Sequence, residues 1–220
     1  MSSGPAPPKR QYDARRRRER AAEERRATGN RVLEAATRLF VAKGYTATTM
    51  ADIAREAGVA MQSVYTAGRS KADLLSAAVE RAVAGDDQEV MVHERPAVTQ
   101  IAEEPDPIRQ MQMAAAFVRD IQERSEPMQV AYREAAAVDV KVAAAVEAAH
   151  RRRRETVGFL IAALPADRLR HPAEECADTV WAVASTETLR LLRTVLGWSW
   201  PEVEAWLART FEDLLLEPAS

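Results

Sequence analysis

Residues 48–65 of this chain read TTMADIAREAGVAMQSVY, and this stretch decides the fold. Thr49 precedes Asp52 by three residues, which is the spacing of a capping box at a helix start, with Asp in place of the usual Glu. Gly58 supplies the left-handed backbone conformation that ends a helix and permits a sharp turn. Two short helices joined by a tight turn are typical of a helix-turn-helix, whose second helix lies in the major groove of DNA. We expect that second helix to turn Val64 inward and to leave its other side chains facing outward.

Amphipathic helices are predicted on both sides of this motif. Upstream, from Thr28 onward, apolar residues recur at i, i+3, i+4 and i+7 and give one apolar face, and we expect the helix to end at Gly44. Downstream, Ser70 and Asp73 again have the spacing of a capping box, and the helix that they open is expected to end near Gly85. The upstream apolar face consists of Val32, Leu33, Ala35, Ala36, Leu39 and Phe40.

The composition favours an all-α protein. Hydrophobic residues make up 47% of the 220 residues but aromatic residues only 5%, Ala is abundant, and the alternation typical of strands is absent. The single Cys176 excludes an internal disulfide, and the three histidines lack the spacing of metal ligands, so we expect no metal and no other cofactor. Paired carboxylates and nucleophile–base sets are also lacking, so no catalytic residue is assigned and an enzyme is not expected. Since no apolar run has the length of a membrane span or a signal peptide, we expect a cytoplasmic protein without membrane contact.

The net charge of −2 conceals an asymmetry between the two parts of the chain. Residues 1–84 hold 16 Lys and Arg against 9 Asp and Glu, whereas residues 85–220 hold 15 against 24. A positive N-terminal third on a negative remainder indicates that the N-terminal third meets a polyanion.

The first 27 residues are expected to form a disordered basic arm. Residues 1–10 contain one glycine and three prolines, and residues 11–26 carry seven arginines without an apolar face. A frayed helix is the other form open to residues 11–26. Two roles also stay open: a solvated tail, or an arm that follows phosphates or enters a minor groove.

The remainder of the chain is predicted to be helical after an acidic loop or broken helix at residues 86–107. Prolines mark the expected starts of helices or the gaps between them. The expected helices span roughly residues 107–125, 127–163, 172–197 and 201–216.

The N-terminal pattern resembles the DNA-binding domain of TetR-family transcriptional regulators over about residues 28–80. The residues that carry the resemblance stand in a fixed order: Arg31-Val32-Leu33-Glu34-Ala35-Ala36, Leu39-Phe40, Gly44-Tyr45, Thr48-Thr49-Met50, Ile53-Ala54, Ala57-Gly58-Val59, Val64-Tyr65, Lys71 and Leu74-Leu75. The chain departs from the family where Ala60 replaces a common Ser, and where Ala67 and Gly68 replace a His or Tyr and then a Phe.

The resemblance implies an all-α homodimer that binds a DNA operator and responds to a small molecule. Residues 28–70 are then the helix-turn-helix DNA-binding domain, and residues 71–220 form a helical effector-binding and dimerisation domain. In the family, an effector shifts the fourth helix and so changes the spacing of the two recognition helices.

The candidate DNA contacts divide into base contacts and phosphate contacts. Gln62 can make a bidentate contact to adenine, Ser63 can donate or accept, and Met61 or the methyl group of Thr66 can pack on a thymine methyl. Tyr65, Thr49, Arg69 and Lys71 are better placed for phosphates. The full set is Thr48, Thr49, Ala60, Met61, Gln62, Ser63, Tyr65, Thr66, Arg69 and Lys71. The alternatives left open are capping by Thr48 and Thr49, core packing of Met61, and packing of Tyr65 on the first helix.

The C-terminal part offers candidates for an effector pocket and for a dimer interface. Apolar residues of the central helices can line a pocket, with ordinary core packing as the alternative. The last two helices carry more apolar surface than a small domain needs, which favours a homodimer interface. The pocket candidates are Met111, Phe117, Met128, Tyr132, Phe159 and Trp181; the interface candidates are Trp181, Leu191, Val195, Val203, Trp206, Leu207 and Phe211.

Three other functions compete with a ligand-released repressor. A regulator of the same fold can be controlled by a protein partner instead of a small molecule. An α-helical enzyme is a second class, although no residue pattern supports it. A nonspecific architectural DNA binder is a third, which the basic arm suits but discrete recognition helices do not.

Overall fold

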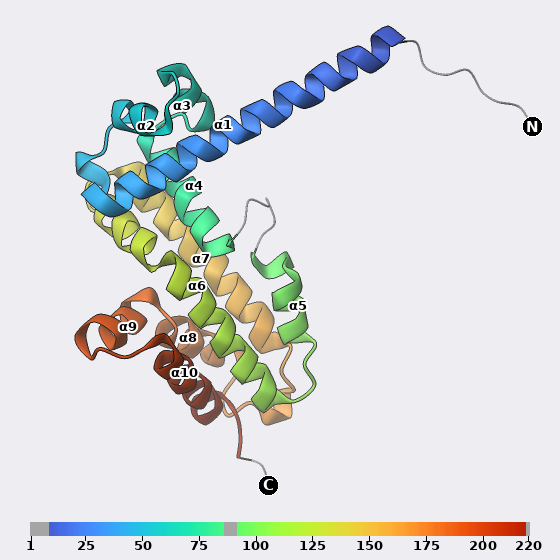
Figure 1. The fold of residues 1–220 in the computed structure, drawn as a ribbon. Coiled ribbons are helices and arrows are strands. Elements are labelled where there is room, and N and C mark those ends of the chain that lie inside the picture. Colours follow the sequence, from blue (N-terminus) through green and yellow to red (C-terminus); the bar gives the residue numbers. More distant parts are fainter. Residues whose placement is uncertain (1–8, 86–91, 219–220) are drawn as a thin grey trace, which may run out of the picture. The chain divides into compact units, whose positions relative to one another are not determined.

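The computed structural model describes residues 9–85 and 92–218, and every regular element within these ranges is helical (Figure 1). The predicted all-α class is confirmed. The chain divides into two compact units, Met1–Ala78 and Val79–Ser220. We expected the division between residues 70 and 71, but it falls eight residues later, inside a helix.

The first unit is built from α1 (Lys9–Ala47), α2 (Met50–Ala57), α3 (Met61–Ala67) and the start of α4 (Lys71–Ala84). The backbone of α1 leaves helical geometry at Gly44, where φ is 77°. The predicted apolar stripe of α1 packs against the two short helices, and Arg38 forms an ion pair with Glu56 of α2 at 3.1 Å. The buried residues of this core include Val32, Ala35, Ala36, Leu39, Phe40, Ile53, Ala54 and Val64.

The local signals at the helix ends act as predicted. The Thr49 hydroxyl accepts from the Asp52 N–H, and the Asp52 carboxylate accepts from the Thr49 N–H, which completes the capping box of α2. Gly58 adopts φ 65° and ψ 38° and donates its N–H to carbonyls of the last turn of α2. Ser70 accepts from the Asp73 N–H at the start of α4.

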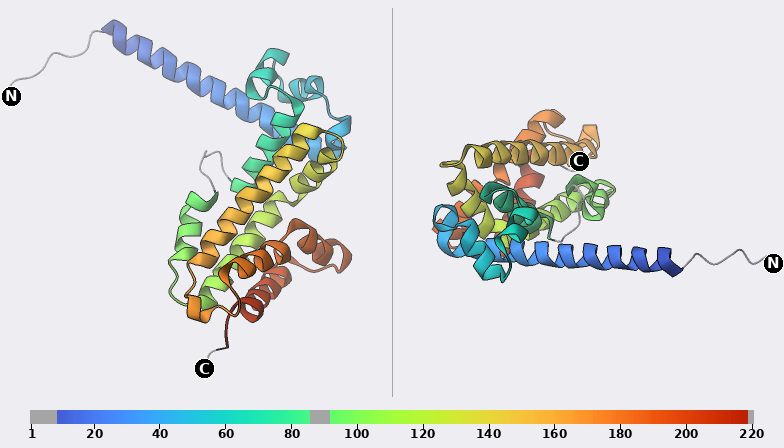
Figure 2. Two further views of the ribbon diagram at one scale, coloured as in Figure 1. Left: turned by 180° about the vertical axis from the view of Figure 1, so that it is seen from behind. Right: turned by 90° about the horizontal axis from the view of Figure 1, so that it is seen from above.

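The expectation of a disordered basic arm is corrected for residues 9–27. These residues form the N-terminal half of α1, which runs on past the packed part of the unit (Figures 1 and 2). Arg, Glu and Ala dominate this segment, and all three are strong helix formers, whereas neither Gly nor Pro occurs between Lys9 and Thr28. Residues 1–8 of the expected arm lie outside the described residues.

The second unit takes the rest of the chain. After α4 it contains the short 3-10 helix η1 (Val92–Glu94), α5 (Pro96–Ala102), the long helices α6 (Pro107–Ala136) and α7 (Val140–Ala162), and the 3-10 helix η2 (Ala166–Arg168). Then follow α8 (Ala173–Val183), α9 (Thr186–Arg190), the π-helix η3 (Leu191–Val195) and α10 (Trp200–Leu215). The broken helix expected within residues 86–107 is confirmed for its described part, and the last helix agrees with the prediction to within a residue at each end.

Two predicted helix boundaries are wrong. α6 continues through Pro127 to Ala136, and the break comes at Asp139, whose carboxylate accepts from two N–H groups of α7. Pro127 lacks the N–H that would donate to the Glu123 carbonyl. Glu123 and Pro127 both lie on the exposed side of α6, where the helix tolerates this loss. The helix expected over 172–197 ends at Val183, because Ser185 caps a new helix by accepting from the Thr188 N–H.

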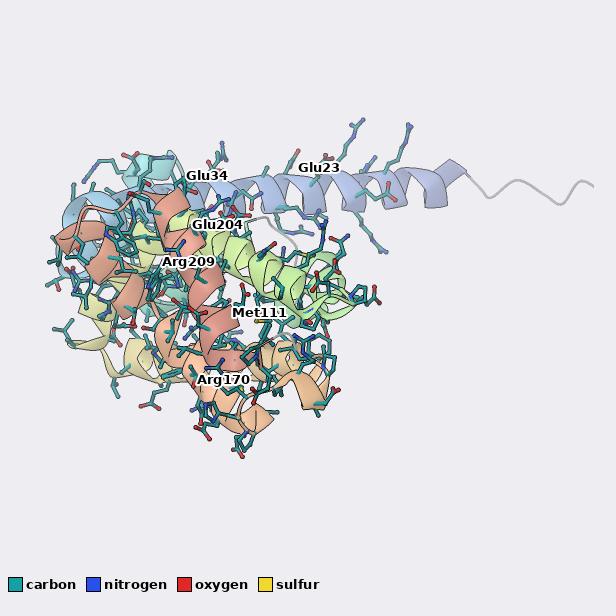
Figure 3. The ribbon with its side chains drawn as sticks, turned by 90° about the horizontal axis from the view of Figure 1, so that it is seen from below. Glu23, Glu34, Met111, Arg170, Glu204 and Arg209 are labelled. Carbon is teal, nitrogen blue, oxygen red and sulfur yellow. The ribbon has the colours of Figure 1, made fainter. Side chains whose placement is uncertain are left out.

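The core of the second unit joins α6, α7, α8, α9 and α10. Met111 of α6 is 3% exposed, and Leu207 of α10 is fully buried. Arg119 of α6 binds Glu204 of α10 at 2.8 Å, and this hydrogen bond raises the pKa of Arg119. Figure 3 labels Met111 and Glu204. Within the described ranges, the helices all lack the combination of length and apolarity that crossing a membrane requires.

Candidate nucleic-acid interface

The third helix presents one continuous outward face. Successive residues of an α-helix are about 100° apart, so Met61, Tyr65, Gln62 and Thr66 follow one another over an arc of about 140°. All four side chains are exposed, with Met61 at 39% and Tyr65 at 47%, whereas Val64 on the other side is fully buried. This arrangement excludes core packing for Met61 and leaves Gln62 free to reach an external partner.

Two of the outward side chains are oriented by hydrogen bonds of their own helix. The Thr66 hydroxyl donates to the Gln62 carbonyl at 2.8 Å. Its donor is therefore engaged with the backbone, and its methyl group is the part left for an apolar contact. Ser63 is half-buried at the border of the face. Ala60 begins α3 without a side-chain cap, as expected from its methyl side chain.

The two threonines before α2 have different environments. Thr48 is fully buried, and its hydroxyl lies 2.8 Å from the Gly44 carbonyl and 3.3 Å from the Leu39 carbonyl. Its proposed DNA contact is therefore wrong, because its hydroxyl serves the end of α1. Thr49 is exposed, and its hydroxyl donates to the Asp52 carboxylate at 2.7 Å, which lowers the pKa of Asp52. The capping alternative thus holds for Thr49, whose DNA contact stays a prediction.

Lys71 connects the start of α4 to the end of α1. Its Nζ donates to the Tyr45 carbonyl at 2.9 Å and lies 4.0 Å from the centroid of the Tyr45 ring. Sequence reasoning did not find this structural role, since the two residues are 26 positions apart. An ammonium group has three donors, so a phosphate contact stays possible for Lys71 as well.

The segment between α3 and α4 is shaped by a close approach of two residues. Gly68 is buried, and a Cβ atom at this position would lie 2.5 Å from Cδ2 of Leu74. Leu74 therefore occupies the space next to the glycine at the position where the family commonly has an aromatic residue. Arg69, which follows directly, is exposed and available for a phosphate.

The six pocket candidates differ in their exposure. Met111, Met128 and Tyr132 are at most 5% exposed and belong to the packed interior. Phe159 is 48% exposed on α7. Exposed fractions do not decide whether these side chains border a closed cavity, so the pocket lined by these six residues stays a prediction.

Trp181 lies in a cluster with Arg153 and His150. Arg153 donates to the Trp181 carbonyl at 2.9 Å and stacks 5.6 Å from its ring, and His150 contacts the ring edge-on. Burial lowers the pKa of Arg153 to about 10. A guanidinium with that pKa remains charged at neutral pH, so the cluster holds a fixed positive charge beside an aromatic ring.

Phe117, one of the six candidates, lines a cavity of the second unit. This cavity has a volume of about 620 Å³ and lies among the end of α4, η1, α5 and α6. Its walls are mainly apolar, with charged groups at Glu94, Arg95, Asp120 and Arg124. Among the described residues, the lining includes Val83, Ala84, Val92, Glu94, Arg95, Pro96, Ala97, Phe117, Asp120, Ile121 and Arg124.

Two arginines of this cavity bind the C-terminal turn of α4. Arg124 donates to the Ala82 and Val83 carbonyls at 3.1 and 2.6 Å, and Arg95 donates to the Ala84 carbonyl at 3.0 Å. The last carbonyls of a helix lack partners within the helix and carry partial negative charge, so a guanidinium stabilises them. Sequence reasoning missed both arginines, because nothing in the sequence indicates contacts across 11 residues for Arg95 or across more than 40 residues for Arg124. We name these two residues the arginine clamp.

The interface candidates also separate into two groups. Val203, Leu207 and Phe211 are at most 2% exposed within a single chain. Their assignment to a dimer interface is wrong, because the apolar face of α10 is needed for the core of its own chain. Trp181 and Trp206 are half-buried, and Trp206 packs edge-on against Trp198.

An exposed apolar surface remains at η3. Leu191, Val195 and Leu196 are 52%, 68% and 60% exposed. Two of these residues are interface candidates, and Leu196 is an addition that the structure makes. We call these three residues the η3 patch.

These features define a class of protein. It has a helix-turn-helix unit whose second helix exposes one face, and an all-α second unit follows. Residues 32–78 match the family described as bacterial regulatory proteins, tetR family. A search of curated proteins finds no match.

Solved structures extend the similarity over most of the chain. NalD of Pseudomonas aeruginosa, the secondary repressor of the MexAB-OprM multidrug efflux pump, has a TM-score of 0.68 and 20% identity, covering 90% of this chain and 100% of that one. A protein described as a transcriptional regulator from Saccharomonospora viridis, in complex with choline, has a TM-score of 0.65 and 20% identity with the same coverage. A TetR-family regulator of Mesorhizobium loti has a TM-score of 0.69 and 17% identity over 88% of this chain and 98% of its own. At such identities the neighbours establish the fold.

The resemblance to the tetR family of bacterial regulators that the sequence predicts is confirmed for residues 32–78, and the structural neighbours share the fold of the chain. It has the fold of a transcriptional regulator with a helix-turn-helix.

The substitution Thr48→Val tests the structural role of Thr48. It keeps the shape of the side chain and removes the hydroxyl that the α1 carbonyls accept from. We expect a loss of about 1–3 kcal/mol in the free energy of unfolding, measured by denaturant titration, because buried carbonyls lose their donor. The folded variant should bind DNA as the wild type does. A selective loss of DNA affinity at unchanged stability would restore Thr48 to the interface.

Proposed function

We propose that this protein is a cytoplasmic transcriptional repressor without catalytic activity, which binds a palindromic operator as a homodimer and is released by a small-molecule effector. The observation that carries the proposal is the outward arc of α3, which holds Met61, Gln62, Tyr65 and Thr66 on one exposed face. A face of this composition suits the major groove, where an amide can pair with adenine and methyl groups can contact thymine.

The proposed contacts combine base readout with positioning. Gln62 and Ser63 read base edges, and Met61 with the Thr66 methyl group packs on thymine methyls. Tyr65, Arg69 and Lys71 bind phosphates, and Thr49 joins them when its hydroxyl turns from the Asp52 carboxylate to a phosphate. Phosphate contacts fix the register of α3 but carry no sequence information of their own.

Dimerisation follows from the η3 patch. A palindromic operator requires two recognition helices related by two-fold symmetry. Leu191, Val195 and Leu196 form an apolar group that a self-complementary contact would remove from water. We propose that this patch contributes the centre of the interface.

The cavity among the end of α4, η1, α5 and α6 is the proposed effector site. It shares Phe117 with the pocket expected from the sequence. An occupant would contact Arg124 and Arg95, which hold the last turn of α4, and α4 continues into the DNA-binding unit. The choline-bound regulator among the structural neighbours supports a small organic molecule as the occupant.

Selection of bound DNA from a random pool tests the function as a whole, since an operator should appear as two inverted half-sites. With that operator, Gln62→Ala should cost about 1–3 kcal/mol of binding free energy and relax the preference at one base pair in each half-site. Affinities for operator and random duplexes are compared at one stated salt concentration. Gln100→Ala removes an exposed amide elsewhere on the chain and is the matched control. Equal losses on operator and random DNA would contradict the role of Gln62 as a base reader.

The substitution Val195→Glu tests the dimer surface. A carboxylate in the centre of a two-fold contact faces its own copy and should shift the protein toward monomers at micromolar concentration, measured by sedimentation. Val140→Glu is the control, because Val140 is 83% exposed and lies outside the patch. A wild-type protein that sediments as a monomer, or a dimer that Val195→Glu leaves unchanged, would refute the assignment.

The substitution Ala97→Trp tests the effector site by filling the cavity from the first turn of α5. Small organic molecules, choline among them, are screened for release of wild-type protein from operator DNA. A compound that acts should be at least about tenfold weaker on Ala97→Trp, because one indole occupies a large share of the volume, while operator affinity without compound stays unchanged. Equal potency on both proteins would place the effector elsewhere.

A further inference from the structure

The N-terminal half of α1 has a surface that the helix-turn-helix does not use. Residues 16–27 hold six arginines and three glutamates, and every charged side chain among them is exposed. The segment has no large apolar residue, so it offers no face for a core or for a membrane interior. Figure 3 shows its side chains standing away from the helix on both sides, with Glu23 labelled.

The arginines and glutamates are not mixed evenly around this helix. Residues seven positions apart differ by only about 20° in direction. Arg18, Arg25, Val32 and Leu39 therefore form one nearly straight line along α1. Val32 and Leu39 are at most 8% exposed and face α2 and α3. Arg18 and Arg25 thus lie on the same side of α1 as the buried residues Val32 and Leu39, in the part of the helix that precedes the packed core.

The acidic residues lie on the other side of the helix. Glu19, Glu23 and Glu24 share that side with Arg16 and Arg20, at the three- and four-residue spacings that allow ion pairs. Arg16 and Glu19 each already have an interaction partner.

Arg18 and Arg25 differ from this group in their sequence neighbours. The positions three and four residues before and after them hold Ala, Arg, Thr or Gly, without a carboxylate. Their charge is therefore not neutralised along their own helix. Because they are about 10 Å apart on one side, they form a row that a polyanion can follow.

We propose that this row is a second DNA-contacting surface, which binds backbone phosphates flanking the segment that α3 contacts. The inference rests on the proposed operator-binding function and extends it. The row faces the side of α1 on which α2 and α3 lie, so duplex DNA seated on α3 has its continuation on that same side. The helical segment before Thr28 spans about 28 Å, close to one turn of duplex, which sets the reach of the contact. It adds affinity that does not depend on base sequence.

The test compares two double variants of the full chain that remove the same charge. Arg18→Gln/Arg25→Gln changes the row, and Arg16→Gln/Arg20→Gln changes the acidic side; Gln keeps the helix propensity high. Both are titrated with an operator duplex carrying about 10 flanking base pairs at each end, and with the same operator trimmed of its flanks. On the long duplex we expect the first variant to lower the slope of log affinity against log salt by about 2 per chain, one for each lost phosphate contact. The second variant should stay near the wild type.

Three further results decide the inference. On the trimmed duplex both variants should bind as the wild type does, and Arg18→Lys/Arg25→Lys should restore binding to the long duplex. Equal slopes for the two Gln variants, or an equal loss on long and trimmed duplexes, would overturn the proposal. A wild-type protein that selects no DNA from a random pool would instead refute the proposed function itself, so the two failures are distinguishable.

Discussion

The recognition surface of this protein depends on the burial of Val64. The helix α3 has seven residues, and isolated helices of that length are not stable in water. Val64 is fully buried on the inner side of α3, and the apolar stripe of α1 supplies its neighbours. This single anchor sets the rotation of α3 about its axis and thereby decides that Met61, Gln62, Tyr65 and Thr66 face outward. The capping box of α2 and the turn at Gly58 then fix where the short helix begins.

The first unit could be predicted from the sequence because its signals are local. Capping boxes, the left-handed Gly58 and the spacing of the apolar stripe act within a few residues. Both partners of each interaction are therefore visible in a short stretch of sequence. Thr48 shows the limit of such reasoning. A threonine next to a helix start has the same sequence signature whether its hydroxyl meets a phosphate or a carbonyl nine residues away, and only the path of the chain between them separates the two cases.

The second unit was less predictable because its decisive contacts are long-range. The tolerance of Pro127 depends on its position on the exposed side of α6, which helix periodicity alone does not reveal. The apolar stripe of α10 predicted burial correctly, but its partner was the core of the same chain and not a second copy. In the arginine clamp, Arg124 contacts carbonyls more than 40 positions away, and no pattern in the sequence marks it among the many arginines of the chain.

Gly68 limits which helices from related proteins can replace α3 in this chain. Its missing side chain lets Leu74 occupy the adjacent space, so the hinge between α3 and α4 and the first turn of α4 are fitted to each other as a pair. A recognition helix transplanted from a relative with an aromatic residue at this position would bring a ring into the volume that Leu74 fills. Specificity can therefore be moved into this chain only by replacing the outward residues one by one, or by exchanging α3 together with the start of α4 as a single cassette.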